Sequence, residues 1–431
     1  MNEINPRGKI VERALLVGAF FKQTDRPEAE SLLQELEELV TTLGVPIVDR
    51  MLIFGRETHA QYLLGTGKAA EIAERVKIEG LDSVIFDNEL TPSQQRNWEK
   101  ITGVAVLDRQ EVILDIFAQR AQTHEARLQI ELARLEYSLP RLTRAWGHLV
   151  RQGGGIGAKG EGESQLEQDK RRIRTAIGRL KDQLKEVRTI RSTQRKDRKR
   201  TPVPNAAIVG YTNAGKSSLM RRLTGAEVLV EDKLFATLDT TTRKVSLPNH
   251  QPLLLTDTVG FVRRLPHRLV EAFRATLEES VLAEFLVHVL DVSQPEVLTF
   301  YKTTMEVLAE LGTDTKRMIL AFNKVDQVEE RSKLEPLRHQ FPEAHFISTH
   351  TGEGIDGLVE HMAELASNGS RVCTLELPAA AGDRLARLHR SAQILETRYE
   401  EDRVCLVAVL SPAMLRDYQD CVKASEREGL Q

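Results

Sequence analysis

The chain has 431 residues, of which 41% are hydrophobic and 29% charged, and its formal net charge is −3. This composition is typical of a soluble globular protein, and no apolar run approaches the roughly eighteen residues that a membrane span needs. The N-terminus lacks the continuous apolar core of a signal peptide, so we expect a cytoplasmic protein. At this length about two to four domains are expected.

The first part of the chain, residues 1–115, alternates short apolar runs with helix-like segments. This alternation predicts a small parallel α/β domain. The expected strands are residues 13–20, 45–53, 83–87 and 104–108, and the expected helices are residues 28–43 and 69–80.

Residues 116–200 are expected to form an antiparallel helical hairpin. From about residue 110 the pattern is that of one long helix ending at Pro140, and a second helix follows a charged loop at 151–165 that has six glycines in positions 153 to 162. Both helices carry apolar residues three and four apart. These residues are Leu128, Leu132, Leu135 and Leu139 in the first helix, and Leu166, Ile173, Ile177, Leu180, Leu184 and Val187 in the second.

The second helix of this hairpin is strongly basic. Residues 170–200 contain fourteen Lys or Arg residues against three acids. On a helix that also has an apolar face, such an excess forms a stripe suited to phosphate backbones. For the final segment, residues 195–200, a solvated linker is an equally good interpretation.

Residues 201–368 form a second region of alternating apolar runs and helical stretches. The pattern predicts a doubly wound parallel sheet, in which ligands bind at the carboxyl ends of the strands. Residues 369–431 are expected to form a small α/β appendage with apolar runs at 371–379 and 403–410 and a helix at 383–394.

The strongest motif in the second region is GYTNAGKS, Gly210 to Ser217, which lies between an expected strand and an expected helix. It matches G-x-x-x-x-G-K-[ST], in which backbone N–H groups surround the phosphates of a nucleotide. Lys216 is predicted to reach the β- and γ-phosphates, and the Ser217 hydroxyl is predicted to ligate Mg²⁺.

Two further motifs are predicted to contact the nucleotide, one at the γ-phosphate and one at the base. Asp257 and Gly260 form D-x-x-G, in which the aspartate holds Mg²⁺ through water and the glycine N–H senses the γ-phosphate. Asn323-Lys324-Val325-Asp326 forms N-K-x-D, and the Asp326 carboxylate can accept from both N1–H and the 2-amino group of guanine. Motifs in this order predict a Ras-like GTPase domain that binds GTP and GDP.

The remaining candidate contacts to GTP lie in two loops. In the segment 234–243 Thr237 is the predicted second protein ligand of Mg²⁺, with Thr240, Thr241 and Thr242 as alternatives. After the last strand, a backbone N–H near Ser348 and Thr349 is predicted to bind guanine O6. The other residues predicted at the GTP site are Tyr211, Thr212, Asn213, Ala214, Gly215, Phe235, Ala236, Leu238, Asp239, Thr258, Val259 and His350.

Phe261 follows D-x-x-G, at the position where a water-orienting glutamine stands in Ras-like proteins. An aromatic ring cannot position the attacking water, so the catalytic residue is unknown. We expect slow intrinsic hydrolysis that a partner accelerates, or a threonine or bound cation that replaces the glutamine. Asn213 occupies the place that positions K⁺ in some GTPases of this type, although an ordinary loop asparagine is an equally good interpretation.

The order of these motifs resembles the HflX family of GTPases over nearly all of residues 10–365. The resemblance includes segments outside the GTPase motifs: IFDNELTPSQQRNWE, VLDRQEVILDIFAQRA, LQIELARLEYSLPRLTR, RQGGGIGAKGEGESQLEQDKRRI and DTVGFVRRLP. It implies a GTPase that binds the large ribosomal subunit, 23S rRNA and ribosomal proteins included. It further implies that ribosomes stimulate hydrolysis and that the protein splits or rescues stalled ribosomes under stress.

In that family the glycine-rich loop lies at the tip of the hairpin and approaches ribosomal RNA. The resemblance therefore implies phosphate contacts from Arg151, Lys159, Lys170, Arg171 and Arg172, with a plain connector as the alternative. This chain departs from the family loop G-x-R-G-P-G-E-T-Q-L-E at three positions, Lys159, Glu161 and Ser164. It also has Thr66 where the family commonly has lysine, which argues against adenine-nucleotide binding in the first domain.

Two alternatives stay open beside the splitting or rescue role. The protein could be an assembly GTPase for immature large subunits, or an RNA- and ribosome-binding scaffold in which GTP is mainly structural. An ATP-driven RNA remodeller is less well supported, since no second G-x-x-x-x-G-K-[ST] is present. We expect a monomer that is partly ribosome-associated.

Overall fold

The computed structural model describes residues 11–21, 26–142, 159–198, 203–225, 234–235, 238, 240–248, 251–264, 280–313, 317–367, 371–400, 402–410 and 412–425. The fold is mixed α/β, as the sequence predicts, and the chain forms two compact units. The first unit comprises Met1–Glu186 with two short later segments, Asp232–Leu238 and Arg263–Arg274. The second comprises Val187–Glu231, Asp239–Val262 and Ala275–Gln431.

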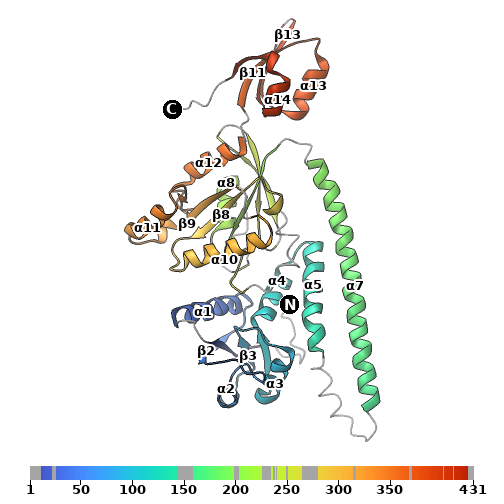
Figure 1. The fold of residues 1–431 in the computed structure, drawn as a ribbon, viewed down its shortest axis with the longest axis vertical. Coiled ribbons are helices and arrows are strands. Elements are labelled where there is room, and N and C mark those ends of the chain that lie inside the picture. Colours follow the sequence, from blue (N-terminus) through green and yellow to red (C-terminus); the bar gives the residue numbers. More distant parts are fainter. Residues whose placement is uncertain are drawn as a thin grey trace. The chain divides into compact units, whose positions relative to one another are not determined.

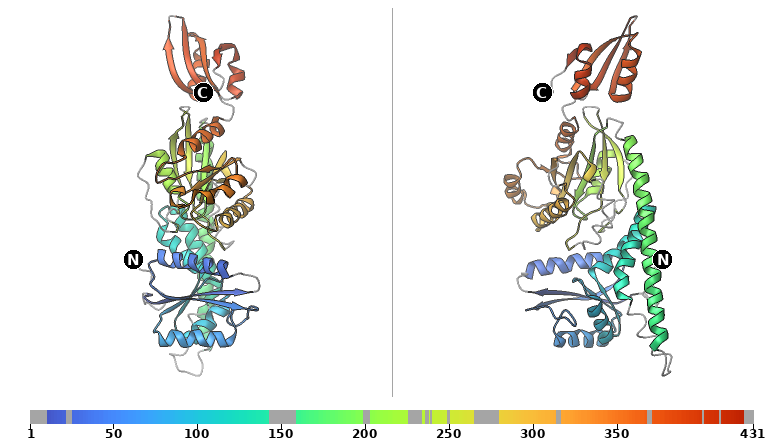
Figure 2. Two further views of the ribbon diagram at one scale, coloured as in Figure 1. Left: turned by 90° about the vertical axis from the view of Figure 1, so that its left-hand side faces the viewer. Right: turned by 45° about the vertical axis from the view of Figure 1, so that its right-hand side comes forward.

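The first unit is built on a four-stranded parallel sheet with the order β2-β1-β3-β4. Helix α1 lies on one side of this sheet and α2 on the other (Figures 1 and 2). Because side chains alternate along a strand, Leu15 and Val17 face the core that includes α2, while Phe20 packs with Ala29 and Leu32 of α1. The elements are β1 (Ala14–Phe21), α1 (Arg26–Thr42), β2 (Ile47–Gly55), α2 (Thr66–Ile78), β3 (Ser83–Phe86), α3 (Pro92–Thr102) and β4 (Ala105–Asp108).

The prediction of one long helix from about residue 110 is wrong, because the structure has two helices there. Helix α4 (Arg109–Arg120) ends at Ala121, whose backbone is extended, and α5 (His124–Ser138) starts after Thr123. The Thr123 hydroxyl accepts from the Ala126 N–H, which is the N-cap bond that begins a new helix. A short 3₁₀ turn, Leu139–Arg141, follows α5.

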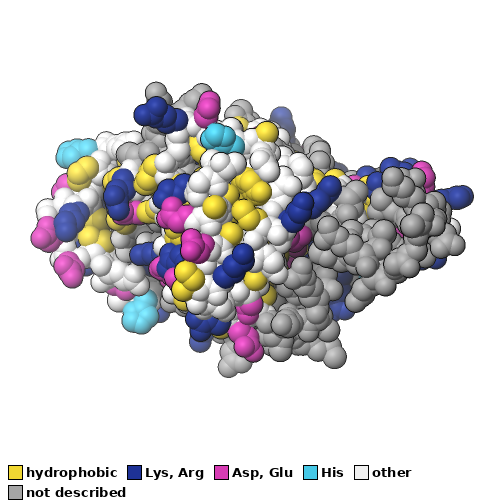
Figure 3. Space-filling model, turned by 90° about the horizontal axis from the view of Figure 1, so that it is seen from below, with side chains coloured by type: hydrophobic (Ala, Val, Ile, Leu, Met, Phe, Trp, Pro, Cys, Tyr) yellow, Lys and Arg dark blue, Asp and Glu magenta, His cyan; other side chains and the backbone are white. Residues whose placement is uncertain are grey.

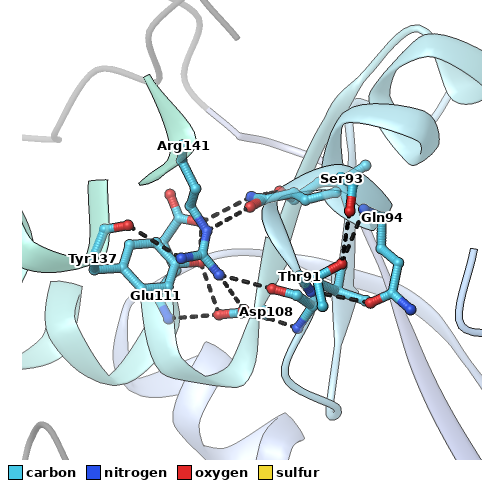
Figure 4. A network of polar contacts seen from close by, with 10 residues as sticks. Thr91, Ser93, Gln94, Asp108, Glu111, Tyr137 and Arg141 are labelled. Atoms are coloured by element: carbon cyan, nitrogen blue, oxygen red, sulfur yellow. Dashed lines mark hydrogen bonds and ion pairs between the residues drawn. The ribbon is translucent and has the colours of Figure 1, made fainter. Parts of the chain in front are cut away.

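Buried polar side chains connect α5 and the 3₁₀ turn to the end of strand β4 through hydrogen bonds and an ion pair (Figure 4). Asp108, at the end of β4, accepts at Oδ1 from the Tyr137 hydroxyl at 3.0 Å and from the Glu111 N–H at 3.0 Å. Arg141 donates to Gln95 Oε1 at 2.9 Å and lies 3.4 Å from Asp108 Oδ2. Burial raises the pKa of the Asp108 carboxyl, and these donors oppose that shift.

Helix α7 (Lys159–Arg198) begins earlier than the sequence suggests, so the predicted glycine-rich loop does not extend to residue 165. Each glycine costs about 1 kcal/mol in a helix, but the Lys, Glu and Gln residues between them are good helix formers. In the first unit α7 runs beside α5, and Lys181 pairs with Glu136 at 2.8 Å (Figure 1). Leu180 and Leu184 of the predicted apolar face are buried.

The second unit contains a six-stranded sheet with the order β10-β9-β8-β5-β7-β6, in which only β6 is antiparallel to its neighbour. Its central strand β5 is buried because helices cover both faces, which explains the apolar run that precedes the phosphate-loop motif. The elements are β5 (Asn205–Gly210), α8 (Lys216–Thr224), β6 (Thr241–Ser246), β7 (Pro252–Asp257), β8 (Phe285–Asp291), α10 (Val297–Glu310), β9 (Arg317–Asn323), α11 (Glu335–Gln340), β10 (His345–Phe346) and α12 (Ile355–Ser367).

The C-terminal residues form an antiparallel sheet with the order β12-β13-β11-β14. Strands β11 and β13 alternate buried and partly exposed residues, so one face holds a core and the other is accessible. The elements are β11 (Arg371–Pro378), α13 (Gly382–Ser391), β12 (Gln393–Tyr399), β13 (Arg403–Leu410), α14 (Pro412–Asp417) and β14 (Val422–Ser425). Among the helices of the described residues, none is long and apolar enough to cross a membrane.

Candidate functional site

The G-x-x-x-x-G-K-S segment forms the loop between β5 and α8. Gly210 and Gly215 have φ angles of +145° and +95°. A Cβ on Gly210 would lie 2.2 Å from the Val289 carbonyl oxygen, and one on Gly215 would lie 2.1 Å from Asn323 Nδ2. Both positions therefore require glycine. The loop leads into the N-terminus of α8, and the N-terminus of a helix favours an anion.

Lys216 is buried at the start of α8, and its amine donates to the Tyr211 carbonyl oxygen at 2.6 Å across the loop. Burial lowers the pKa of this amine to about 8, while the nearby Asp257 carboxylate opposes the shift. The amine is therefore mostly protonated at pH 7 and lies within the loop where phosphates are predicted to bind.

Two oxygen donors meet beside the loop. The Ser217 hydroxyl donates to Asp257 Oδ2 at 2.6 Å, and Asp257 stands at the carboxyl end of β7. Mg²⁺ prefers oxygen ligands and is usually held by few protein groups together with phosphates and water. The donor set therefore fits Mg²⁺, with Ser217 and Asp257 as the groups that would hold it, and a bound ion would neutralise charge on the phosphates. The proposed second ligand, Thr237, lies outside the described residues.

The segment after β7, which we call switch II (Asp257–Arg264), folds back on the phosphate loop. The Phe261 N–H donates to the Gly210 carbonyl oxygen at 3.1 Å, and the Thr212 N–H donates to the Phe261 carbonyl oxygen at 2.8 Å. The Phe261 side chain is buried, with 1% of its surface exposed. At the position of the expected glutamine, the chain thus presents a buried ring that cannot orient water.

The N-K-x-D segment begins at the carboxyl end of β9 and joins three loops. The Asn323 side chain donates to the Ala214 carbonyl oxygen at 2.9 Å and accepts from the Thr349 N–H at 3.0 Å. Lys324 pairs with Asp291 at 2.8 Å. Asp326 Oδ2 lies 4.0 Å from His350 Nδ1, and its carboxylate is partly exposed. The phosphate loop, this segment and the Ser348–His350 loop thus lie together.

Other predicted residues differ in their surroundings. Asn213 is exposed and has a φ angle of +59°, a backbone conformation that asparagine tolerates well. This conformation accounts for an asparagine at position 213 without a role in binding K⁺. Thr258 donates to the Ile208 carbonyl oxygen at 2.6 Å. Among the alternatives to Thr237, Thr242 bonds Thr256 across the β6–β7 pair at 2.9 Å. Val259 and Val325 are buried apolar residues.

The segment 234–243 is described only in part, because Ala236 and Asp239 also lie outside the described residues. Leu238 is buried. Phe235 packs edge-on against Phe117 of α4, with ring centroids 4.5 Å apart, in the first unit. Its side chain therefore has a packing role that the motif did not reveal.

Sequence reasoning missed two contributors to the site. Asp291 fixes the Lys324 amine, and its place at the carboxyl end of the central strand β8 was the available signal. Phe300 of α10 stacks on the Tyr211 ring, with centroids 4.2 Å apart and planes at 17°. No motif identifies this contact, because it joins two elements far apart in sequence.

The residues predicted to contact RNA are only partly described. Arg151 and the side chain of Lys159 lie outside the described parts of the chain. Lys170, Arg171 and Arg172 follow one another on α7, and the last two are exposed. Arg172 lies 3.5 Å from Asp169 in a surface ion pair, which is weak enough for a phosphate to replace.

Three family models match the chain in succession. Residues 30–118 match the model described as GTP-binding GTPase N-terminal, and residues 120–198 match the GTP-binding GTPase Middle Region. Residues 205–324 match the model described as 50S ribosome-binding GTPase. A solved GTP-binding protein from Sulfolobus solfataricus, in complex with GDP, is 24% identical with a TM-score of 0.44, covering 83% of this chain and 99% of that one.

Curated relatives match almost the whole chain. The GTPase HflX of Akkermansia muciniphila is 49% identical over 425 residues, covering 96% of this chain and 97% of the relative. The GTPase HflX of Escherichia coli (strain K12) is 40% identical over 402 residues, covering 93% and 94%. Full-length similarity at this level, together with the phosphate-loop geometry, shows that the chain is a GTP hydrolase that belongs to the HflX family of GTPases.

Proposed function

We propose that this GTPase acts on the large ribosomal subunit, which stimulates its hydrolysis of GTP, and that it splits or rescues stalled ribosomes. The observation that carries the proposal is the match of residues 205–324 to the 50S ribosome-binding GTPase model. We further propose that Gly210–Ser217 and Asp257–Gly260 bind the phosphates, with Mg²⁺ held directly by Ser217 and Thr237 and through water by Asp257. Asn323–Asp326 and Ser348–His350 would bind guanine.

The surroundings of Phe261 support stimulated hydrolysis. Its ring is buried and its backbone is bonded to the phosphate loop, so this position supplies no group that can orient water. Ribosome binding would have to rearrange switch II or supply the missing group. The protein alone should therefore turn over GTP slowly.

The charge distribution supports binding to RNA through α7. Lys and Arg outnumber acids there, whereas Figure 3 shows both signs interspersed across the described part of the visible face. A basic helix face binds phosphates with little sequence preference and with strong dependence on salt. Lys170, Arg171 and Arg172 are the described candidates for these contacts.

The test is GTP turnover with and without purified large subunits, at fixed Mg²⁺ and K⁺, with Lys216→Ala as the blank. We expect strong stimulation in the wild type. Replacing Lys170, Arg171 and Arg172 by Gln should weaken subunit binding. It should also reduce the slope of the logarithm of the binding constant against the logarithm of the salt concentration by about two to three, near one per phosphate contact. It should leave unstimulated turnover unchanged. Lys68→Gln, which removes an exposed lysine paired with Glu71 on α2, is the matched control.

The result against the proposal would be tight nucleotide binding without stimulation by subunits. A second arm separates splitting from assembly. Conversion of intact ribosomes into subunits supports splitting. Sedimentation with precursor particles, without such conversion, would replace splitting by the assembly role.

A further inference from the structure

An aromatic pair joins helix α10 to the phosphate loop within the second unit. The Phe300 ring lies nearly parallel to the Tyr211 ring, with centroids 4.2 Å apart and planes at 17°. Both side chains are buried, and they and the phosphate loop belong to the second unit. Aromatic pairs contribute free energy beyond that of their buried area, so this contact restrains the position of Tyr211.

The peptide group that links Tyr211 to Thr212 makes hydrogen bonds through both of its polar atoms. Its carbonyl oxygen accepts from the Lys216 amine at 2.6 Å, and its N–H donates to the Phe261 carbonyl oxygen at 2.8 Å. The C=O and N–H of one peptide bond lie in one plane. These two bonds and the stacked Tyr211 ring therefore fix the orientation of that plane together.

The placement of Lys216 depends on this peptide group. Its side chain is buried, but a lysine stem is flexible and has several rotamers. The bond to the Tyr211 carbonyl oxygen selects the rotamer in which the amine lies across the loop. In loops with this motif the lysine reaches the β- and γ-phosphates. A displaced Tyr211 carbonyl would therefore leave the amine poorly placed for a phosphate.

Helix α10 is anchored to its own sheet by contacts that do not involve the phosphate loop. Tyr301, next to Phe300, stacks on His288 of β8 with ring centroids 5.5 Å apart, and it packs edge-on against Phe341. Thr304, one turn later on α10, is fully buried. The helix is thus a fixed support, and the Phe300 ring extends that support to the loop.

We propose that Phe300 is a positioning residue for phosphate binding: its ring holds Tyr211, and the Tyr211 carbonyl oxygen in turn holds the Lys216 amine where it meets the β-phosphate. Phe300 need not touch the nucleotide, because it acts on the amine through the loop. This role rests on the phosphate-binding function proposed for Gly210–Ser217. Loss of the ring should weaken the binding of nucleotides that carry a β-phosphate and spare those that lack one.

The test measures the affinities of the full chain for GDP and for GMP, which share guanine and the α-phosphate and differ in the β-phosphate. Phe300→Leu removes the ring and keeps an apolar side chain. An aromatic pair is worth about two- to tenfold in an equilibrium, so the ratio of GDP affinity to GMP affinity should fall about fivefold. GMP affinity should stay nearly unchanged. Phe300→Tyr, which keeps the ring, should retain the wild-type ratio.

Phe341→Leu is the matched control, because it removes a ring that packs on α10 at Tyr301 and lies outside the phosphate loop. It should lower the melting temperature and leave the ratio unchanged. If Phe300 had a purely structural role, Phe300→Leu would lower GDP and GMP affinities by the same factor. An unchanged ratio in Phe300→Leu, or in Phe300→Met if the leucine variant does not fold, overturns the proposal.

Lys216→Ala separates the role of Phe300 from the phosphate site itself. It should lower the same ratio by more than Phe300→Leu does, because it removes the amine and not only its support. If Lys216→Ala leaves the ratio unchanged, the phosphate-binding function of the loop fails, and the role of Phe300 fails with it. If Lys216→Ala lowers the ratio and Phe300→Leu does not, only the role of Phe300 is overturned.

Discussion

Replacement of Asn323 by Ala tests whether one side chain holds the nucleotide site together. Asn323 is fully buried and bonds both the Ala214 carbonyl oxygen and the Thr349 N–H. Each lost hydrogen bond costs about 1 kcal/mol, and a buried group left unsatisfied costs about 1–3 kcal/mol. We therefore expect a loss of about 2–4 kcal/mol, divided between folding and nucleotide binding. Because about 1.4 kcal/mol is a factor of ten, GDP affinity should fall at least tenfold.

Replacement of Asn323 by Asp sharpens the test. A carboxylate still accepts from the Thr349 N–H, but it places an oxygen against the Ala214 carbonyl oxygen where the amide now donates. Asp should therefore be more damaging than Ala, although it is closer in shape to Asn. The assays are GDP titration by fluorescence and thermal unfolding with and without GDP. Affinity within twofold of wild type for Asn323→Ala, or an Asp variant better than Ala, would refute this reasoning.

Three further predictions concern the same fold. Gly260→Ala should reduce GTP turnover at least tenfold, because the added Cβ would lie within 2.8 Å of Lys216 Nζ; unchanged turnover in a single-cycle assay would contradict it. Raising the pH from 7 to 8.5 should weaken GDP binding about fourfold, because Lys216, with a pKa of about 8, loses the charge that attracts phosphate. A GDP affinity that does not change with pH over this range would show that the charge is not required. Asp108→Asn should lower the free energy of unfolding by about 2 kcal/mol, because every described neighbour bonded to this carboxylate donates to it. This loss should be larger than that of Tyr137→Phe, and equal melting temperatures of the two variants would refute the prediction.

Local sequence determined the elements and the phosphate loop. Apolar runs identified the parallel strands of both sheets, because strands buried in such sheets are mostly apolar. They did not identify the antiparallel edge strand β6, whose sequence TTRKVS is polar and largely exposed. Gly210 and Gly215 were identifiable because a phosphate-binding loop requires left-handed backbone at fixed spacing. The break at residues 121–123 was missed, since apolar residues recur at helical spacing on both sides of it. The extended backbone of Ala121 and the Thr123 cap do not alter that spacing.

Tertiary structure alone decided which distant residues share a site. Asn323 lies 109 residues from Ala214, and Arg263 lies 228 residues from Glu35, so no local pattern relates the members of either pair. In the sequence, Arg263 and Arg264 are an ordinary basic pair after Phe261. Only the fold brings them to the buried carboxylates of Glu35 and Asp87, because chain connectivity fixes neither the packing partners of a loop nor the burial that makes a charge pair strong.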